Sequence, residues 1–196
     1  MERNRDDIFD SLHQYFLSIG LKKKRKNFFI KEFEDGYWYI DRLSESRRNV
    51  VRTSYQIGFH LYEAEKTAAE LMHEKYSRNA ITGTCNLGYL FNSPIYYEQL
   101  IDPYITGEDI LFDVSYHIDR YVIPLFDKYD NLNSFLNAIV HSDEFNNFNI
   151  DPFSNAALHI LAHDFEGAIE IIERAKRLFK DEDEKNSCIS KIKSME

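Results

Sequence analysis

The sequence is poor in the residues that break or cross-link a chain. Its 196 residues include seven glycines, four prolines and two cysteines. So few chain breakers, together with a hydrophobic content of 43%, argue against a disordered protein. Cys85 and Cys188 lie far apart and belong to no CxxC pair, so we expect two free thiols rather than a disulfide framework or a zinc site.

Long apolar runs are also missing. The longest ones are far shorter than the roughly 20 residues that a membrane-spanning helix needs. The first ten residues, "MERNRDDIFD", are charged and lack the apolar segment of a signal peptide. We therefore expect a cytoplasmic protein without a membrane-bound part.

The usual catalytic and phosphate-binding motifs do not occur. There is no GxxxxGK(S/T), GxGxxG, GxSxG or Ser-x-x-Lys pattern. The glycines of "ITGTCNLG" fall in a strand pattern rather than between a strand and a helix, so they do not predict a phosphate-binding loop. We expect no cofactor and name no catalytic residue.

Two histidine patterns have spacings that chemistry could use. His159 and His163 are four residues apart in "HILAHD", which suits a metal pair, but no further ligands complete a zinc site. Asp113 and His117 are also four apart, so the carboxylate could orient the imidazole as a general base. An ordinary packed or surface histidine explains both patterns more simply. A metal-dependent hydrolase is therefore only the third functional hypothesis, and we predict no metal site.

Hydrophobic periodicity predicts an α+β fold with a strongly twisted antiparallel sheet of about four strands packed against helices. Helical spacing and period-two alternation follow one another along the chain. The expected helices are 6–19, 62–77, 107–129 and 131–140, and the expected strands are 27–33, 37–43, 50–61 and 82–91. Gly20 should end the first helix, and Pro124 should kink or break the third.

The C-terminal part reads as a helical addition. Residues 141–155 are rich in Asn, Asp and Ser, which favours a boundary there. Helices at about 154–163 and 165–180 then resemble a single tetratricopeptide-type pair, which cannot bury its apolar face alone. We predict an α+β domain at 1–145 and a helical extension at 146–196 that docks on it.

Charge is divided unevenly along the chain. Residues 1–60 contain 12 basic and 9 acidic side chains, whereas residues 61–196 contain 12 and 24, which gives a net charge of −9. Basic residues beside Tyr37, Trp38 and Tyr39 could form a platform for single-stranded nucleic acid, and Arg42 is a further one nearby. The net negative charge opposes this hypothesis. The alternative basic patch comprises Lys22, Lys23, Lys24, Arg25, Lys26, Arg47, Arg48 and Arg52. In the structural interpretation, Lys22–Lys26 merely link the first helix to the first strand.

The acidic part suggests a protein partner. Glutamates recur along the helix at 62–77, and an acidic run begins at residue 181. An acidic inhibitor of a basic toxin gains association rate and specificity from complementary charge, and it needs no catalytic residue. The candidate partner-binding residues are Glu63, Glu65, Glu70, Glu74, Asp181, Glu182, Asp183 and Glu184. For any one of them, a solvated helix face is the simpler explanation.

Four stretches, "SIGLKKKRKNFFIKE", "SYQIGFHLY", "GTCNLGYLF" and "DRYVIPLFDKYDNLNSFLN", resemble the bacterial domain-of-unknown-function family 4304. The resemblance covers roughly residues 5–140, and the Trp-rich segment of the family is replaced here by "NSPIYYEQL". It implies an α+β fold, a bacterial cytoplasm and no established reaction, and some relatives are regarded as immunity proteins. The leading hypothesis is therefore a non-enzymatic protein-binding module, such as an immunity protein that inhibits a cognate basic toxin. Nucleic-acid binding through residues 22–26 and 47–52 is the alternative.

Overall fold

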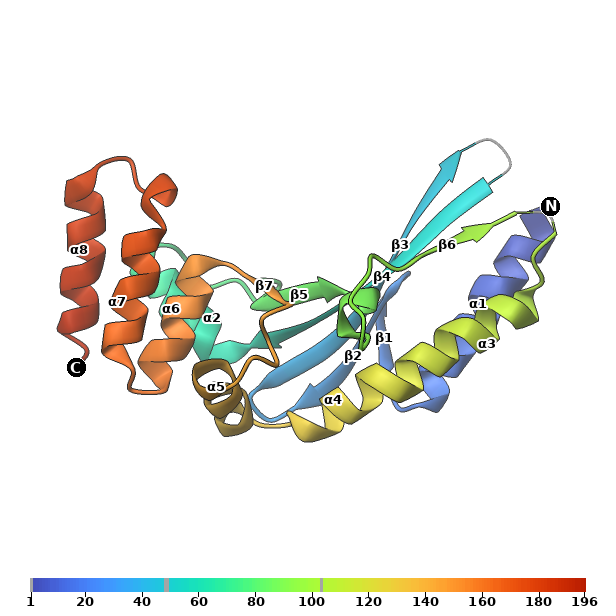
Figure 1. The fold of residues 1–196 in the computed structure, drawn as a ribbon, viewed down its shortest axis with the longest axis horizontal. Coiled ribbons are helices and arrows are strands. Elements are labelled where there is room, and N and C mark those ends of the chain that lie inside the picture. The colour runs from blue at the N-terminus through green and yellow to red at the C-terminus, as the bar shows by residue number, and fades with distance from the viewer. Residues whose placement is uncertain (1, 48–49, 103) are drawn as a thin grey trace. The chain divides into compact units, whose positions relative to one another are not determined.

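The fold is α+β, as the sequence predicts, and its antiparallel sheet packs with helices (Figure 1). The computed structural model describes residues 2–47, 50–102 and 104–196. Within these residues the sheet has seven strands, in the order β1-β2-β3-β4-β5-β7, and β6 also pairs with β4. The prediction of about four strands was therefore wrong.

The additional strands are short and lack the alternation by which strands are recognised. β1 (Lys22–Arg25) has four exposed side chains, β6 (Glu98–Ile101) is four residues long, and β7 (Asn149–Ile150) has two residues. Backbone pairing with a longer neighbour holds each of them: β1 pairs with β2, β6 with β4 and β7 with β5. Such strands are set by their neighbours rather than by their own residues.

The chain divides into two compact units. Unit 1 comprises residues 1–32, 37–58 and 85–129, and unit 2 comprises residues 33–36, 59–84 and 130–196. The chain thus changes units five times, and the strands β3 (Gly36–Arg47) and β4 (Val50–Leu61) contribute residues to both. The boundary expected after residue 145 stays a prediction.

Unit 1 begins with helix α1 (Glu2–Ser18), which Gly20 ends as predicted. Gly20 has a φ of 86°, and the backbone N–H of Leu21 donates to the carbonyl of Phe16 at 3.1 Å. This is a Schellman-type termination, in which glycine adopts the left-handed conformation at low cost. β1 and then β2 (Phe28–Phe33) follow directly.

The helices from residue 107 onward complete unit 1, and they pack on its first helix and on a buried aromatic residue of its strands. Helix α3 (Gly107–His117) contacts α1, and a π-helical turn (Ile118–Val122) separates it from α4 (Ile123–Lys128). The helix does not break at Pro124: it continues from α3 through the π-helical turn into α4, and the expected disturbance takes the form of this π turn just before the proline. Trp38 is fully buried and stacks on Phe126, with 4.9 Å between the ring centroids. Its indole N–H donates to the carbonyl oxygen of Tyr129 at 2.7 Å.

The segment predicted as one strand at 82–91 changes conformation halfway. β5 (Gly83–Asn86) is followed by a short 3-10 helix (Leu87–Leu90). Asn86 is buried, and its side-chain oxygen accepts hydrogen bonds from the backbone N–H groups of Gly88 and Tyr97. This cap turns the chain out of the strand, because it satisfies backbone donors that a continuing ladder would otherwise have used.

Unit 2 is mainly helical. It contains α2 (Tyr62–Leu71), α5 (Leu132–His141), α6 (Pro152–Leu161), α7 (Phe165–Arg174), a short 3-10 helix (Lys176–Leu178) and α8 (Glu182–Lys193). α2 ends six residues before the predicted limit at 77, and the expected helical pair is present as α6 and α7.

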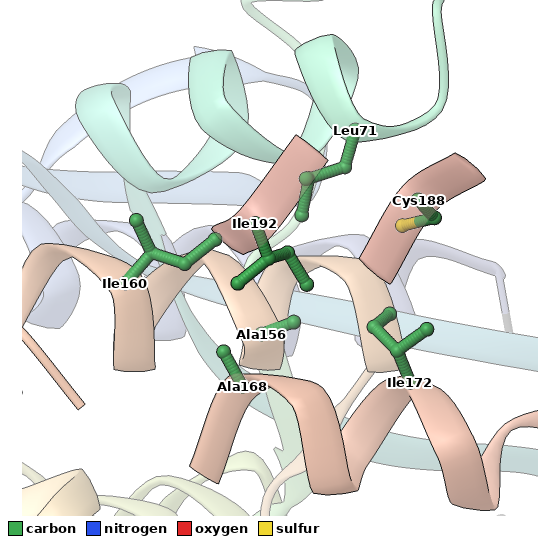
Figure 2. Packing of buried hydrophobic residues seen from close by; sticks show 7 residues of the cluster. All are labelled: Leu71, Ala156, Ile160, Ala168, Ile172, Cys188 and Ile192. Carbon is green, nitrogen blue, oxygen red and sulfur yellow. The ribbon is translucent and has the colours of Figure 1, made fainter. Parts of the chain in front are cut away.

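The helical pair does not stand alone. α6 contacts α2, α7 contacts α8, and α2 contacts α8, so the four helices enclose one apolar cluster (Figure 2). Small residues on α6 and α7 allow the close approach of these two helices. The buried members of the cluster are Leu71, Ala156, Ile160, Ala168, Ile172, Cys188 and Ile192. A single helix pair thus acquires the additional apolar contacts that it needs to be stable.

Candidate functional site

A cavity of about 550 Å³ in unit 1 is the first candidate site, because buried polar groups gather around it. α1 places Phe9 and His13 on it, because these residues are four apart and share one helix face. β3 contributes Arg42 and Ser44, which are two apart and so lie on the same side of the strand. Lys26 and Asn27 in the turn between β1 and β2 and Val51 of β4 also line it, and the carbonyl oxygen of Asn27 accepts the backbone N–H of Arg42 at 3.0 Å.

Arg42 is the central group of this cavity. It is only 3% exposed, and its Nη2 donates to Oδ1 of Asn27 at 2.7 Å. Its Cζ lies 3.5 Å from the centroid of the Phe9 ring, which is close enough for a strong cation–π contact. Nε and Nη1 are buried and have no hydrogen-bond partner among the described residues. Burial lowers the pKa of the guanidinium from its usual value, as expected for a cation without a matching anion.

His13 lies beside Arg42 and is also buried. Its ring centroid lies 5.1 Å from that of Phe29, and its Nδ1 is 3.9 Å from Oδ1 of Asp10. Its Nε2 finds no hydrogen-bond partner in the described part of the chain. Burial and the adjacent Arg42 charge lower the pKa of this imidazole to about 4. His13 is therefore neutral at pH 7, and Arg42 is the buried cation of the cavity.

The predicted basic patch is only partly assembled. Lys22 pairs with Glu32 at 2.5 Å, and Arg52 lies 3.8 Å from Glu98. Lys24 and Arg25 lie over aromatic rings, and Lys26 lines the cavity. Lys23 is exposed on β1. The side chain of Arg47 and the whole of Arg48 fall outside the described residues.

The aromatic residues near the basic patch belong to the core. Tyr37, Trp38 and Tyr39 are 4%, 0% and 2% exposed. Bases stack on exposed rings, so these three cannot supply the platform that the nucleic-acid hypothesis used. The exposed lysines could still contact the phosphate groups of a nucleic acid. Binding of nucleic acid stays a prediction that rests on charge alone.

The predicted acidic residues all lie in unit 2, but they differ in environment. Glu65 is buried, accepts a hydrogen bond from Ser154 at 3.0 Å and has its pKa raised by burial, so its carboxylate does not face solvent. Glu63 pairs with Lys66, whereas Glu70 and Glu74 are exposed. Glu63, Glu65 and Glu70 lie in α2, and Glu74 follows it.

The acidic run forms the first turn of α8. Asp181 caps this helix by accepting the backbone N–H of Glu184 at 2.9 Å, and Glu184 accepts that of Lys180 at 2.8 Å. Glu182 pairs with Lys185 at 2.5 Å, and Asp183 is exposed. Carboxylates at this position also stabilise the helix through its dipole, which gives the run a structural role.

The structure brings Asp113 and His117 together, with Nε2 of the imidazole 3.4 Å from the carboxylate. The other carboxylate oxygen of Asp113 accepts hydrogen bonds from the Tyr97 hydroxyl at 2.6 Å and from Gln99 at 2.9 Å. The imidazole of His117 stacks on the ring of Phe91, with 4.2 Å between the ring centroids. The sequence analysis missed Tyr97 and Gln99, because they come from the unpredicted β6 region. The carboxylate is thus held in a packed cluster rather than directed at an open site.

His159 and His163 have different surroundings. Nδ1 of His159 donates to Oδ2 of Asp164 at 2.7 Å, and Asp164 also accepts the backbone N–H of Gly167 at 3.0 Å as the cap of α7. His163 is exposed in the turn, with a φ of 60°. In the part of the chain that the structure describes, no three His, Cys, Asp or Glu side chains gather as a metal site would require.

A second cavity, of about 410 Å³, lies in unit 2. Its charged groups already have partners, since Arg174 pairs with Glu170 at 2.8 Å and His159 is bound to Asp164. The Arg42 cavity differs, because Nε and Nη1 of Arg42 have no hydrogen-bond partner within the described residues. Among the described helices, none combines the length and the apolar character needed to cross a membrane.

In the sequence, Arg42 is one of several basic residues, and no pattern distinguishes His13. The available signal was the position of Arg42 two residues after Ile40 in a predicted strand, which places both side chains on the same side of it. Comparison with protein-family models, with curated proteins and with solved structures finds no match for the chain.

Proposed function

We propose that this chain is a non-enzymatic module that binds a basic partner protein through the surface of unit 2. One observation carries the proposal. Unit 2 contains 19 Asp and Glu against 10 Lys and Arg, whereas unit 1 contains 14 of each kind. The whole formal net charge of −9 therefore resides in unit 2, which gives it a field that attracts cations.

The acidic side chains of unit 2 are carried on packed helices. Exposed carboxylates occur on α2 at Glu70, on α7 at Glu166 and Glu173, and on α8 at Asp183. These helices share the apolar cluster shown in Figure 2, so little backbone ordering would be required when a partner binds. Complementary charge chiefly raises the association rate and excludes wrong partners. An immunity protein that inhibits a cognate basic toxin is the specific form that we propose.

The test is capture with the full chain from lysates of its native cells, followed by affinity measurement of the captured protein. We expect one stoichiometric basic protein whose binding weakens as salt increases. In unit 2, the double variant Glu74→Lys and Glu173→Lys should weaken binding by at least about tenfold, because it reverses the attractive charge.

The matched control reverses two exposed carboxylates of unit 1, Asp7→Lys and Glu108→Lys, and should change affinity by less than about twofold. Equal losses in the two variants would show that binding follows net charge and not unit 2. Recovery of nucleic acid instead of a protein would contradict the proposal.

Nucleic-acid binding is the second candidate, and the exposure of all four β1 side chains favours it. Fluorescence anisotropy with a labelled single-stranded oligonucleotide at low salt provides the test. Lys23→Glu with Lys24→Glu should weaken binding and reduce its salt dependence. A flat titration of the unaltered protein would eliminate this candidate.

A further inference from the structure

We propose that the cavity of unit 2 binds an uncharged small molecule whose hydroxyl group donates a hydrogen bond to Nε2 of His159. The cavity volume of about 410 Å³ lies in the usual range for small-molecule sites. Its walls come from α5, α6, α7 and the segment between α5 and α6, all of which belong to unit 2. This inference goes beyond the proposed binding of a partner protein and does not depend on it.

Asp164 determines which nitrogen of His159 carries the proton. Nδ1 of His159 lies 2.7 Å from Oδ2 of Asp164, and the backbone N–H of Gly167 donates to Oδ1 of the same carboxylate at 3.0 Å. The hydrogen bond from His159, and then that from Gly167, lower the pKa of Asp164, so the carboxylate is ionised and can only accept. In the neutral imidazole the proton therefore lies on Nδ1, and Nε2 presents a lone pair.

Nε2 of His159 is available to a ligand. Within the described residues this nitrogen forms no hydrogen bond, and it is not one of the buried polar atoms that lack a partner there. The side chain of His159 is 16% exposed and lines the cavity. Nε2 therefore keeps contact with open space, and it can accept a hydrogen bond from a molecule that enters the cavity.

Asn155 supplies a second polar group next to His159. The two residues are four apart on α6, so they share one helix face, and both line the cavity. In the described part of the chain the side-chain amide of Asn155 has no hydrogen-bond partner and is not fully buried. Because an amide both donates and accepts, it can bind the oxygen of the same hydroxyl group or a second polar atom of the ligand.

The charged groups of the cavity favour an uncharged ligand. Arg174 pairs with Glu170 at 2.8 Å, and His159 is bound to Asp164. A charged ligand would lose water without meeting an unpaired opposite charge among the described residues that line the cavity. The apolar part of the lining can contact a ring or a short chain, and it comprises Ile139, Phe145, Phe148, Ile150 and Ile171.

The experiment follows the imidazole signals of His159 by NMR in the full chain at pH 8, with assignment by His159→Gln. Three probes share one naphthalene ring: 2-naphthol carries the hydroxyl donor, 2-methoxynaphthalene lacks it, and 2-naphthoate is an anion. We expect a saturable shift with 2-naphthol and affinities at least about fivefold lower for the other two. D-Glucose is titrated as a hydroxyl-rich probe. Whichever of 2-naphthol and D-glucose binds more tightly identifies the ligand as an aromatic alcohol or a carbohydrate.

Asn155→Ala tests the second polar group. The substitution breaks no hydrogen bond of the described residues, so the variant should fold, and it should weaken binding of 2-naphthol several-fold. Asn137→Ala is the matched control, because Asn137 is exposed on α5 and does not line the cavity. It should leave the affinity unchanged.

Asp164→Asn tests Asp164 as a positioning residue. Asparagine can still cap α7, but its amide can donate to Nδ1 of His159, which leaves the proton on Nε2. Imidazole nitrogen shifts should report Nδ1–H in the unaltered protein and Nε2–H in the variant, and the preference for 2-naphthol over its methyl ether should fall below about twofold. The proposal is overturned if no probe moves the His159 signals, if the three naphthalene probes bind equally, or if the unaltered protein carries the proton on Nε2. Unchanged binding in both Asn155→Ala and Asp164→Asn would also overturn it.

Discussion

His13 links the burial of one imidazole to the pH dependence of the whole protein. Its folded-state pKa of about 4 lies below the unfolded value of 6.5, so the unfolded chain takes up its proton first as pH falls. The contribution of His13 to the free energy of unfolding is fully present above pH 6.5 and is lost as the pH falls toward 4. Between pH 7 and pH 5 the free energy of unfolding, measured with urea, should therefore decrease by about 2 kcal/mol because of this residue.

The comparison that isolates this effect is His13→Gln, because carboxylates also contribute to acid unfolding. The variant should show a shallower loss of stability between pH 7 and pH 5 than the unaltered protein. Parallel curves for the two proteins would mean that His13 is already protonated in the folded state at pH 5.

Gly167 is a second position at which one residue controls a local structure. A Cβ atom at Gly167 would lie 2.2 Å from Oδ2 of Asp164 and 2.6 Å from Nδ1 of His159, which are sub-van der Waals distances. Gly167→Ala should therefore displace the cap of α7 and lower the free energy of unfolding by about 1–2 kcal/mol. Glu166→Ala, at the adjacent exposed position, should change it by less than about 0.5 kcal/mol. Two equal values would show that the cap tolerates the methyl group.

The position of β1 in the sheet explains why basic residues follow one another from Lys22 to Lys26. β1 lies at the end of the strand order, and within the described residues β2 is its strand neighbour, so its other edge faces no strand there. Lysine and arginine on such an edge oppose pairing with another chain. The triple variant Lys22→Val, Lys24→Val and Arg25→Val should therefore self-associate as its concentration increases, measured by light scattering after size exclusion.

Replacement of the same three residues by glutamate is the matched control. It retains charge on the edge, so the oligomeric state should equal that of the unaltered protein. If the valine variant also behaves like the unaltered protein, the charges on β1 have no protective role and a binding role gains support.

Elements with a clear period were predictable, and elements defined by their neighbours were not. β4 alternates in sequence because the side that starts at Val51 is buried throughout, although Ser54 and His60 on the other side are buried as well, and its bounds match the predicted 50–61. β1 shows no alternation, since all four of its side chains are exposed. The Arg42 cavity could not be predicted at all, because it depends on α1 and β3 meeting across nearly thirty residues of sequence. Periodicity reports the burial of a segment and says nothing about which other segment buries it.

At the scale of the whole molecule, the two units follow no single division of the chain. A fragment of residues 1–145 lacks α6, α7 and α8, so α2 loses the partners of its buried Leu71. In this fragment the amides of α2 should exchange with solvent at least about tenfold faster than in the full chain. The amides of α1 and α3 should keep their protection, because unit 1 is complete at residue 129.

Hydrogen exchange measured by mass spectrometry distinguishes these outcomes within one fragment, with unit 1 as its internal reference. Retained protection of α2 would show that residues 1–145 fold as an independent domain, as the sequence predicts. Loss of protection throughout the fragment would show that unit 1 also needs the C-terminal helices.

The five changes of unit along the chain also impose an order on its biosynthesis. A ribosome completes unit 1 at residue 129, but residues 59–84 of unit 2 leave it long before the helices that cover them. At usual elongation rates the last of these helices follows roughly 5–20 s later. For that time α2 lacks the helices α6 and α8 that pack on it in the folded chain.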